Sequence, residues 1–191
     1  MAIPCYVSGK GMYATDWTWQ FKVTVMETLE ATGIGYDTRY RYYQQQFPTM
    51  APSALAQMIC DPIEYYDRDW EAYQAAHGAG GEADAVLTAF MLERDARFRQ
   101  EAQVAIYCYD EAGFGSGLNT MRFLQAEKAI LGFYHAEIKQ QGVNLHNILQ
   151  LAIDFPTLVT LVCYQSLDDI GSILLSWLQK VAASTAIPAR P

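Results

Sequence analysis

Short apolar runs alternate with stretches of helical periodicity along most of the chain. The apolar runs are bounded by glycine, proline or polar residues, which is typical of buried strands. They lie at residues 2–7, 34–38, 103–109, 129–134 and 157–163. The stretches between them place apolar residues three or four positions apart and predict amphipathic helices. These lie at 16–32, 83–101, 118–127, near 144–153 and at 167–182. The alternation predicts a doubly wound, Rossmann-like α/β fold, with a mainly parallel five-stranded sheet and helices on both faces.

The helix at 16–32 carries clear boundary signals. Asp16 stands where an N-cap is expected, and Gly33 stands where the chain leaves the helix. The apolar stripe of this helix consists of Trp17, Phe21, Val25 and Leu29. A strand is predicted directly after it, at 34–38. The chain therefore opens as a strand–helix–strand unit, which indicates parallel pairing.

Residues 39–82 interrupt this alternation. The segment is rich in tyrosine and glutamine, and Pro62 is suited to begin a helix over 62–76. A connection of this length is long for a compact domain. We therefore expect one domain over residues 1–191, with an excursion at about 39–82 that covers or flanks a ligand site. A surface insertion without a role is the alternative.

Composition and charge exclude several classes of protein. A chain of 191 residues has the length of one domain, and 51% apolar with 18% charged residues excludes intrinsic disorder. The 13 basic and 21 acidic residues give a net charge of −8, which disfavours nucleic acid as a partner. No apolar run approaches the roughly 20 residues of a membrane span. The N-terminus also lacks the pattern of a secretory signal.

The cysteines and histidines show no metal-binding spacing. Buried free thiols in a reducing compartment explain the cysteines better than ligation does. We therefore expect a cytoplasmic protein without a metal or a cofactor. The cysteines are Cys5, Cys60, Cys108 and Cys163, and the histidines are His77, His135 and His146.

Two glycine-rich segments follow predicted strands, at 8–11 (SGKG) and at 113–119 (GFGSGLN). In doubly wound sheets, ligands bind beyond the carboxyl ends of the strands. Glycines admit a ligand close to the backbone, and the start of a helix offers free N–H groups to an anion. The second segment therefore predicts phosphate or ribose binding, although a tight turn also requires glycines. The candidate contacts are Ser8, Gly9, Gly113, Gly115, Ser116 and Gly117.

Other polar residues lie near the same predicted edge. Arg122, one turn into the following helix, is suited to an anionic ligand. His135 follows a central strand and can act as a general acid or contact phosphate, although an ordinary loop histidine fits as well. Arg97 and Arg99 are expected on a solvated helix face. A tyrosine cluster can stack on a base or belong to the core or a dimer contact. It comprises Tyr36, Tyr40, Tyr42 and Tyr43.

The region from Glu93-Arg94-Asp95 through the second glycine-rich segment to Lys128-Ala129-Ile130-Leu131 resembles a known family. It is similar to nucleoside 2-deoxyribosyltransferases and the related 2′-deoxynucleoside 5′-monophosphate N-glycosidases. The end of the first strand, Tyr6-Val7-Ser8-Gly9, resembles the substrate-binding loop of that family. The resemblance implies a nucleotide or nucleoside ligand, and cleavage or transfer of an N-glycosidic bond.

The resemblance also implies roles for individual residues. Asp95 falls on the helix aspartate that protonates or orients the base, and Ser116 falls in the turn that meets sugar or phosphate. The nucleophilic glutamate of the family falls on Asn119, whose neutral amide cannot attack C1′ of the sugar. Either Asp110 or Glu111 has taken over this role, or the protein binds a nucleotide without the chemistry. These two acids can also be solvated or cap the following turn.

Residues 144–149 resemble the segment that a neighbouring subunit contributes to the site in this family. The resemblance therefore implies a homodimer or larger assembly, with Asn144 and Asn147 near the cleft of the partner. The segment from Glu111 to Leu131 is also similar to the phosphate-binding segment of Rossmann-like DNA-processing and lysine-decarboxylase-like proteins. That second resemblance implies a non-catalytic nucleotide-binding or sensor protein.

Overall fold

Five parallel strands form one sheet in a computed structural model that describes residues 2–10, 15–60, 75, 83–137 and 145–185. The strand order is β2-β1-β3-β4-β5, and every neighbouring pair is parallel. The predicted α/β fold with a five-stranded parallel sheet is confirmed. The strands are β1 (Ile3–Ser8), β2 (Gly35–Asp37), β3 (Val104–Cys108), β4 (Ala129–His135) and β5 (Val159–Tyr164).

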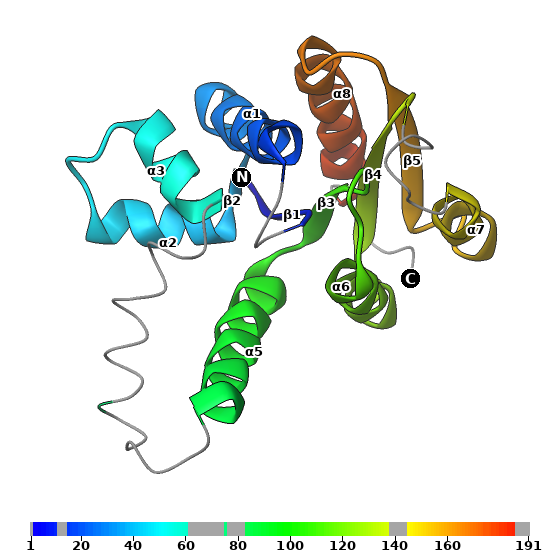
Figure 1. Cartoon of the computed structure of the whole chain (residues 1–191). Coiled ribbons are helices and arrows are strands. Elements are labelled where there is room, and N and C mark those ends of the chain that lie inside the picture. The colour runs from blue at the N-terminus through cyan, green and yellow to red at the C-terminus, as the bar shows by residue number, and fades with distance from the viewer. Residues whose placement is uncertain (1, 11–14, 61–74, 76–82, 138–144, 186–191) are drawn as a thin grey trace, which may run out of the picture.

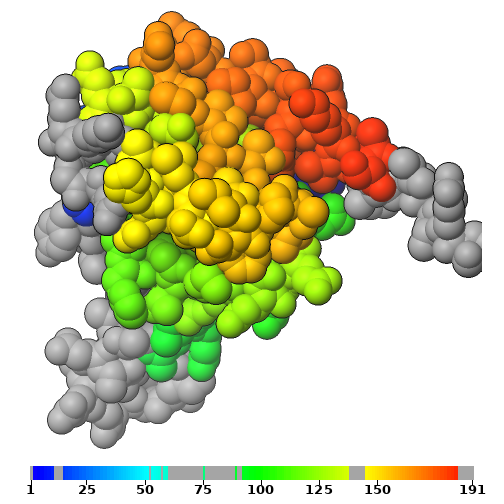
Figure 2. Space-filling model, turned by 90° about the vertical axis from the view of Figure 1, so that its right-hand side faces the viewer, coloured from blue at the N-terminus to red at the C-terminus, as the bar shows by residue number. Residues whose placement is uncertain are grey.

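Helices cover both faces of this sheet (Figure 1). The helices α1 (Asp16–Thr32) and α8 (Asp168–Thr185) lie on one face, and α5 (Ala83–Glu101) and α6 (Phe114–Gln125) lie on the other. Aromatic contacts join the layers: Phe21 of α1 meets Phe133 at 5.3 Å between ring centroids, and Tyr6 of β1 meets Phe123 of α6 at 5.6 Å. Figure 2 shows α7 (Leu145–Asp154) against α6 and β5. Among the helices described, none is long and apolar enough to cross a membrane.

Part of the predicted excursion packs into the core as two helices. These are α2 (Thr38–Gln46) and α3 (Pro52–Cys60). The predicted strand at 34–38 is shorter than expected, because the Asp37 carboxylate accepts the N–H groups of Arg39 and Tyr40 and so caps α2. Helix α3 packs against α1 and α2. Its buried residues are Leu55, Ala56 and Ile59. Most of the predicted helix 62–76 lies outside the described residues.

The predicted N-cap of α1 and the predicted start of α6 are wrong, whereas the predicted range 16–32 of α1 is confirmed. Thr15, and not Asp16, has the extended N-cap conformation of α1, whereas the predicted stop at Gly33 is confirmed by its left-handed backbone with φ 64°. Helix α6 begins at Phe114 instead of at 118, and Gly113 is its N-cap. The glycines lower helix propensity, so the segment resembles a turn. The N–H of Gly117 nevertheless donates to the Gly113 carbonyl at 3.1 Å and closes the first helical turn.

Gly132 in β4 makes room for an aromatic ring. A Cβ atom at this position would lie 2.5 Å from Cε2 of Tyr109 and 2.6 Å from Cδ2 of Leu161. Tyr109 is thereby seated over the sheet, where it stacks on Tyr107 with 5.4 Å between ring centroids. The glycine in this strand therefore has a packing role, and it positions the aromatic residues that follow β3.

Candidate functional site

The strand order reverses between β1 and β3. The chain places β2 on one side of β1 and then returns to place β3 on the other side. In such sheets the crevice beyond the carboxyl ends of these two strands is the usual ligand site. Ser8 ends β1 and is paired in register with Tyr107 near the end of β3. The reversal therefore places two hydroxyl groups at this crevice.

Tyr107 has a buried hydroxyl for which the described part of the chain provides no partner in hydrogen-bonding geometry. Its side chain is fully buried, and no hydrogen bond of normal geometry reaches the hydroxyl within the described residues. The hydroxyl faces Ser8 and lies near Tyr6, Tyr109 and Arg99. Burial raises the pKa of this phenol well above its ordinary value, and the neighbouring phenols of Tyr6 and Tyr109 add to the effect, whereas Arg99 and the nearby Ser8 hydroxyl oppose it. Tyr107 therefore remains a protonated hydrogen-bond donor at the crevice.

Tyr6 lies next to these groups on the same side of the sheet, two positions before Ser8 in β1. Burial raises the pKa of its phenol above its ordinary value. The Asp95 carboxylate raises it further, whereas Arg39 and Arg99 lower it. Asp95 lies one helical turn before Arg99 in α5, and its carboxylate accepts a hydrogen bond from Arg94 at 3.4 Å. Asp95 thus lies close enough to Tyr6 to influence its phenol.

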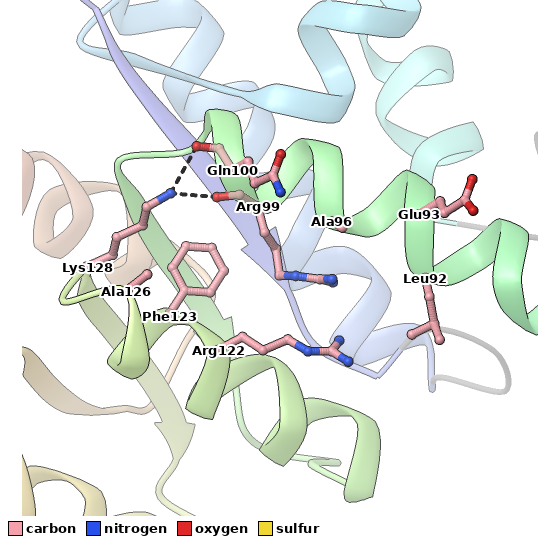
Figure 3. Close-up of a pocket in the computed structure, with 9 residues that line it drawn as sticks. All are labelled: Leu92, Glu93, Ala96, Arg99, Gln100, Arg122, Phe123, Ala126 and Lys128. Carbon is pink, nitrogen blue, oxygen red and sulfur yellow. Dashed lines mark hydrogen bonds between the residues drawn. The ribbon is translucent and has the colours of Figure 1, made fainter.

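Two arginines converge on the carboxamide of Asn119. Nη1 of Arg99 and Nη1 of Arg122 lie 3.0 and 3.2 Å from Oδ1 of Asn119. Arg99 extends from α5 and Arg122 from α6, and both side chains line a pocket of about 480 Å³ (Figure 3). Within the part of the chain that the structure describes, neither guanidinium has a carboxylate within 4.0 Å. The two positive charges therefore share one neutral acceptor.

Arg99 corrects a prediction. It was expected on a solvated face, but only 8% of its surface is exposed, whereas Arg97 is exposed as predicted. The guanidinium of Arg97 lies over the Tyr42 ring at 4.2 Å from the centroid. The spacing Asp95–Arg99 is one helical turn, so the same face that carries the predicted aspartate also carries this arginine. That spacing was the signal that would have identified Arg99.

Lys128 closes the pocket at the end of α5. Its ammonium donates to the carbonyl oxygens of Arg99, Gln100 and Ala102 at 2.7, 3.0 and 2.5 Å. These carbonyls belong to the last turn of α5, or directly follow it, and lack helical partners. Burial lowers the pKa of Lys128 below its ordinary value. Lys128 therefore caps α5 and holds its last turn, including Arg99, beside α6.

Asp110 lies on the other face of the sheet, fully buried. Its Oδ1 accepts the backbone N–H of His135 at 2.6 Å, and its Oδ2 accepts the hydroxyl of Tyr164. The Tyr164 oxygen in turn accepts the indole N–H of Trp17 at 2.6 Å. This network joins β3, β4, β5 and α1. The structure therefore gives Asp110 a connecting role, in which both of its oxygens have donors.

Glu111 holds the start of α1. Its Oε2 accepts the backbone N–H and the hydroxyl of Thr15, both at 2.9 Å, and its Oε1 lies 3.3 Å from Nζ of Lys10. Burial acts to raise the pKa of Glu111, but Thr18, Thr15 and Lys10 around the carboxylate outweigh burial and hold the pKa below 4.5. The residue therefore holds the start of α1, which precedes it in the chain, instead of capping the turn that follows it.

His135 lies at the end of β4, beside Trp17 and Tyr164 in edge-to-face contacts. Its Nδ1 accepts the N–H of Glu137 at 3.2 Å, and its Nε2 lies 3.1 Å from the Gln165 carbonyl oxygen. A neutral ring with the proton on Nε2 satisfies both contacts. His135 therefore lies at the Asp110 side of the carboxyl edge, away from the arginine pair.

The glycine-rich start of α6 and the side chain of Arg122 face two different pockets. Gly113, Gly117 and Asn147 line a hollow of about 660 Å³ between α6 and α7, whereas Arg122 faces α5. Ser116 is buried, with its carbonyl accepting the Thr120 hydroxyl at 2.9 Å. A Cβ atom at Gly113, Gly115 or Gly117 would meet nothing within 4 Å. Packing therefore does not explain these three glycines.

Gly9 does have a packing reason. A Cβ atom there would lie 3.2 Å from Cβ of Cys108 and 3.3 Å from Cγ2 of Thr18. The close approach of β1, β3 and α1 thus favours a glycine at the end of β1. Asn144 of the predicted subunit-contributed segment lies outside the described residues.

The described residues contain no group of histidine, cysteine and carboxylate side chains arranged to hold a metal ion. Cys5 and Cys108 are buried free thiols as expected, whereas Cys163 is exposed. Cys163 lies on β5, an edge strand in which only the first and last residues, Val159 and Tyr164, are buried. No known protein family matches the chain, and a comparison with curated proteins finds no match either.

Proposed function

We propose that the chain binds a nucleotide or nucleoside at the crevice beyond β1 and β3. The observation that carries the proposal is the Tyr107 hydroxyl, a buried donor at this crevice for which the described residues offer no acceptor in hydrogen-bonding geometry. An unpaired buried hydroxyl costs about 1–3 kcal/mol, so its retention favours a ligand acceptor. Ser8 beside it supplies a second hydroxyl. Sugar hydroxyls offer the matching acceptors and donors.

The resemblance to nucleoside deoxyribosyltransferases adds a reaction to this proposal, and Asn119 limits it. A covalent glycosyl intermediate needs a carboxylate nucleophile. The amide of Asn119 instead accepts hydrogen bonds from two arginines, and Asp110 and Glu111 are held by their own donors. We therefore propose binding without covalent cleavage in the natural chain, which is the role of a nucleotide sensor or carrier.

Release of free base from a panel of deoxynucleoside monophosphates tests the reaction. The natural chain should release no base, and Asn119→Glu, which restores the carboxylate, should release it measurably. Asn119→Gln serves as the uncharged control of the same length. Turnover by the natural chain that survives Asn119→Ala but is lost in Asp110→Ala or Glu111→Ala would contradict non-catalytic binding. Isothermal calorimetry with the matching deoxynucleosides tests binding itself, and the absence of any heat of binding would contradict the proposal.

We also propose a homodimer formed through α6 and α7. Phe114 and Ile153 expose 84% and 69% of their surface, and Leu118, Met121 and Leu149 lie on the same pair of helices. Exposed apolar surface of this kind marks interaction sites. A second copy placed here would bring the segment around Asn147 to an interface. Light scattering at tens of micromolar tests this, and a monomer would contradict it.

A further inference from the structure

We propose that the pocket between α5 and α6 is a separate site for a small carboxylic acid with an apolar body. Tyr6, Ser8 and Tyr107 of the crevice beyond β1 and β3 do not line this pocket, so the inference does not rest on the proposed nucleoside site. The pocket volume of about 480 Å³ lies within the range of small-molecule sites. The pocket combines a cationic end with apolar walls, and each part suits one half of such an acid.

Arg99 and Arg122 form the cationic end of the pocket. Nη1 of each guanidinium donates to Oδ1 of Asn119, at 3.0 and 3.2 Å. The two positive charges therefore lie close enough to repel each other, and within the described chain neither has a carboxylate within 4.0 Å. Each guanidinium has five N–H donors in a planar fork, so most of them remain available after the contact with Asn119. A ligand carboxylate accepts such donors in pairs and compensates the two charges.

The local charge at the pocket is positive although the chain carries −8 overall. Lys128 lines the pocket and adds a third cation, with its ammonium on carbonyl oxygens at the end of α5. Glu93 also lines the pocket, and Figure 3 shows its side chain pointing away from the guanidinium groups of Arg99 and Arg122. Arg99 is almost fully buried, so solvent screens its charge weakly. These surroundings favour a ligand that carries a negative charge.

Apolar side chains form the walls of the pocket. They belong to Leu92, Ala96, Phe123 and Ala126. Figure 3 shows Leu92 and Phe123 on either side of the two guanidinium groups. Leu92 exposes 47% of its surface, so a ligand that covers it removes apolar surface from water. An inorganic ion would fill a small part of the volume and leave these walls in contact with water. An acid with an aliphatic or aromatic body covers the walls and places its carboxylate on the arginines.

Isothermal calorimetry with two acids, 3-phenylpropanoate and octanoate, tests the proposal. The natural chain should bind both, and should bind 3-phenylpropanoate at least tenfold more tightly than its uncharged amide or than acetate, which lacks the apolar body. Arg122→Gln should weaken binding of the acids about tenfold, and Arg122→Lys should recover part of the loss, because it keeps the charge but not the planar donors. Ala96→Leu enlarges an apolar wall with a residue that favours helix, and should weaken 3-phenylpropanoate binding about fivefold or more. Arg97→Gln, on the same helix as Arg99 but outside the pocket, is the matched control.

Asn119→Asp gives a second test that keeps the shape of the side chain. It supplies the two arginines with a carboxylate from the chain itself, so it should raise the melting temperature and weaken binding of the acids.

Three results would overturn the proposal. The first is equal affinity for 3-phenylpropanoate and its amide, and the second is the absence of binding by both acids. The third is binding of inorganic phosphate or a deoxynucleoside 5′-monophosphate as tightly as the acids, with the same loss in Arg122→Gln. None of these results bears on the crevice beyond β1 and β3, which the deoxynucleoside titrations test separately.

Discussion

Removing the hydroxyl of Tyr107 should stabilise the free protein and weaken ligand binding. The hydroxyl is buried without a protein partner in the described chain, so Tyr107→Phe removes an unsatisfied donor. Removing such a group should raise the free energy of unfolding by about 1 kcal/mol, which is the low end of the cost of an unpaired buried polar group. The same change removes a donor to the ligand and should reduce nucleoside affinity about fivefold to tenfold.

Tyr109 provides a matched control, because its ring stacks on that of Tyr107 and is buried to the same degree. Its hydroxyl lies 3.0 Å from Oγ1 of Thr120, whose own proton goes to the Ser116 carbonyl. Tyr109→Phe therefore loses a satisfied hydrogen bond, at a cost of about 1 kcal/mol. The same atom is deleted from two neighbouring rings, and the two changes in stability should have opposite signs.

Urea denaturation followed by tryptophan fluorescence measures both variants. The difference between them should be about 2 kcal/mol in unfolding free energy. For a chain of this size that corresponds to roughly 4–8 °C in melting temperature. Equal destabilisation of Tyr107→Phe and Tyr109→Phe would refute the reasoning, because it would show that the Tyr107 hydroxyl already has a partner in the folded chain.

Three further variants test the structural roles of individual residues. Glu111→Gln should lower the free energy of unfolding at pH 7, because the folded carboxyl has a pKa below its ordinary value. This loss of stability should shrink as the pH falls through that folded pKa. A loss that does not depend on pH in urea titrations would contradict this. Alanine at Gly115 and Gly117 together should raise the unfolding free energy by about 1–2 kcal/mol, since each new Cβ meets open space; a lower melting temperature would be the opposing result. Gly132→Ala should cost about 1–3 kcal/mol, because its Cβ would lie 2.5 Å from Cε2 of Tyr109; calorimetric melting equal to that of the wild type would disprove the overlap.

The periodicity of the sequence was sufficient to predict the sheet. Each central strand is a short apolar run that must be buried on both faces, and each helix carries an apolar stripe at helical spacing. These are local properties, so the five strands and most of the helices could be predicted without tertiary information. Gly33 ended α1 as predicted because its left-handed backbone is also a local property.

The residues at the ends of elements depended on tertiary contacts instead. Glu111 holds Thr15, directly before α1, from a distant part of the chain, and the glycine-rich segment is helical from Phe114 onward. A glycine-rich stretch and a capping acid have the same local pattern in a ligand loop as in a structural turn. Only the neighbours in space distinguish these uses.

In the candidate site, too, some residues could be predicted from the sequence, whereas others depended on the tertiary structure. The end of the first predicted strand placed Ser8 at the carboxyl edge, because the ends of parallel strands share one edge of the sheet. Asp95 and Asn119 were placed there only by the resemblance to nucleoside deoxyribosyltransferases. The sequence treated Arg122 and the glycine-rich segment as one anion site, whereas the helix turns them toward different pockets. It also assigned Arg99 to solvent, because a charged residue on a helix is usually exposed. The packing of α5 against α6 and the carbonyl contacts of Lys128 decide that Arg99 is buried beside Asn119. Such convergence is a property of helix packing, which no local pattern encodes.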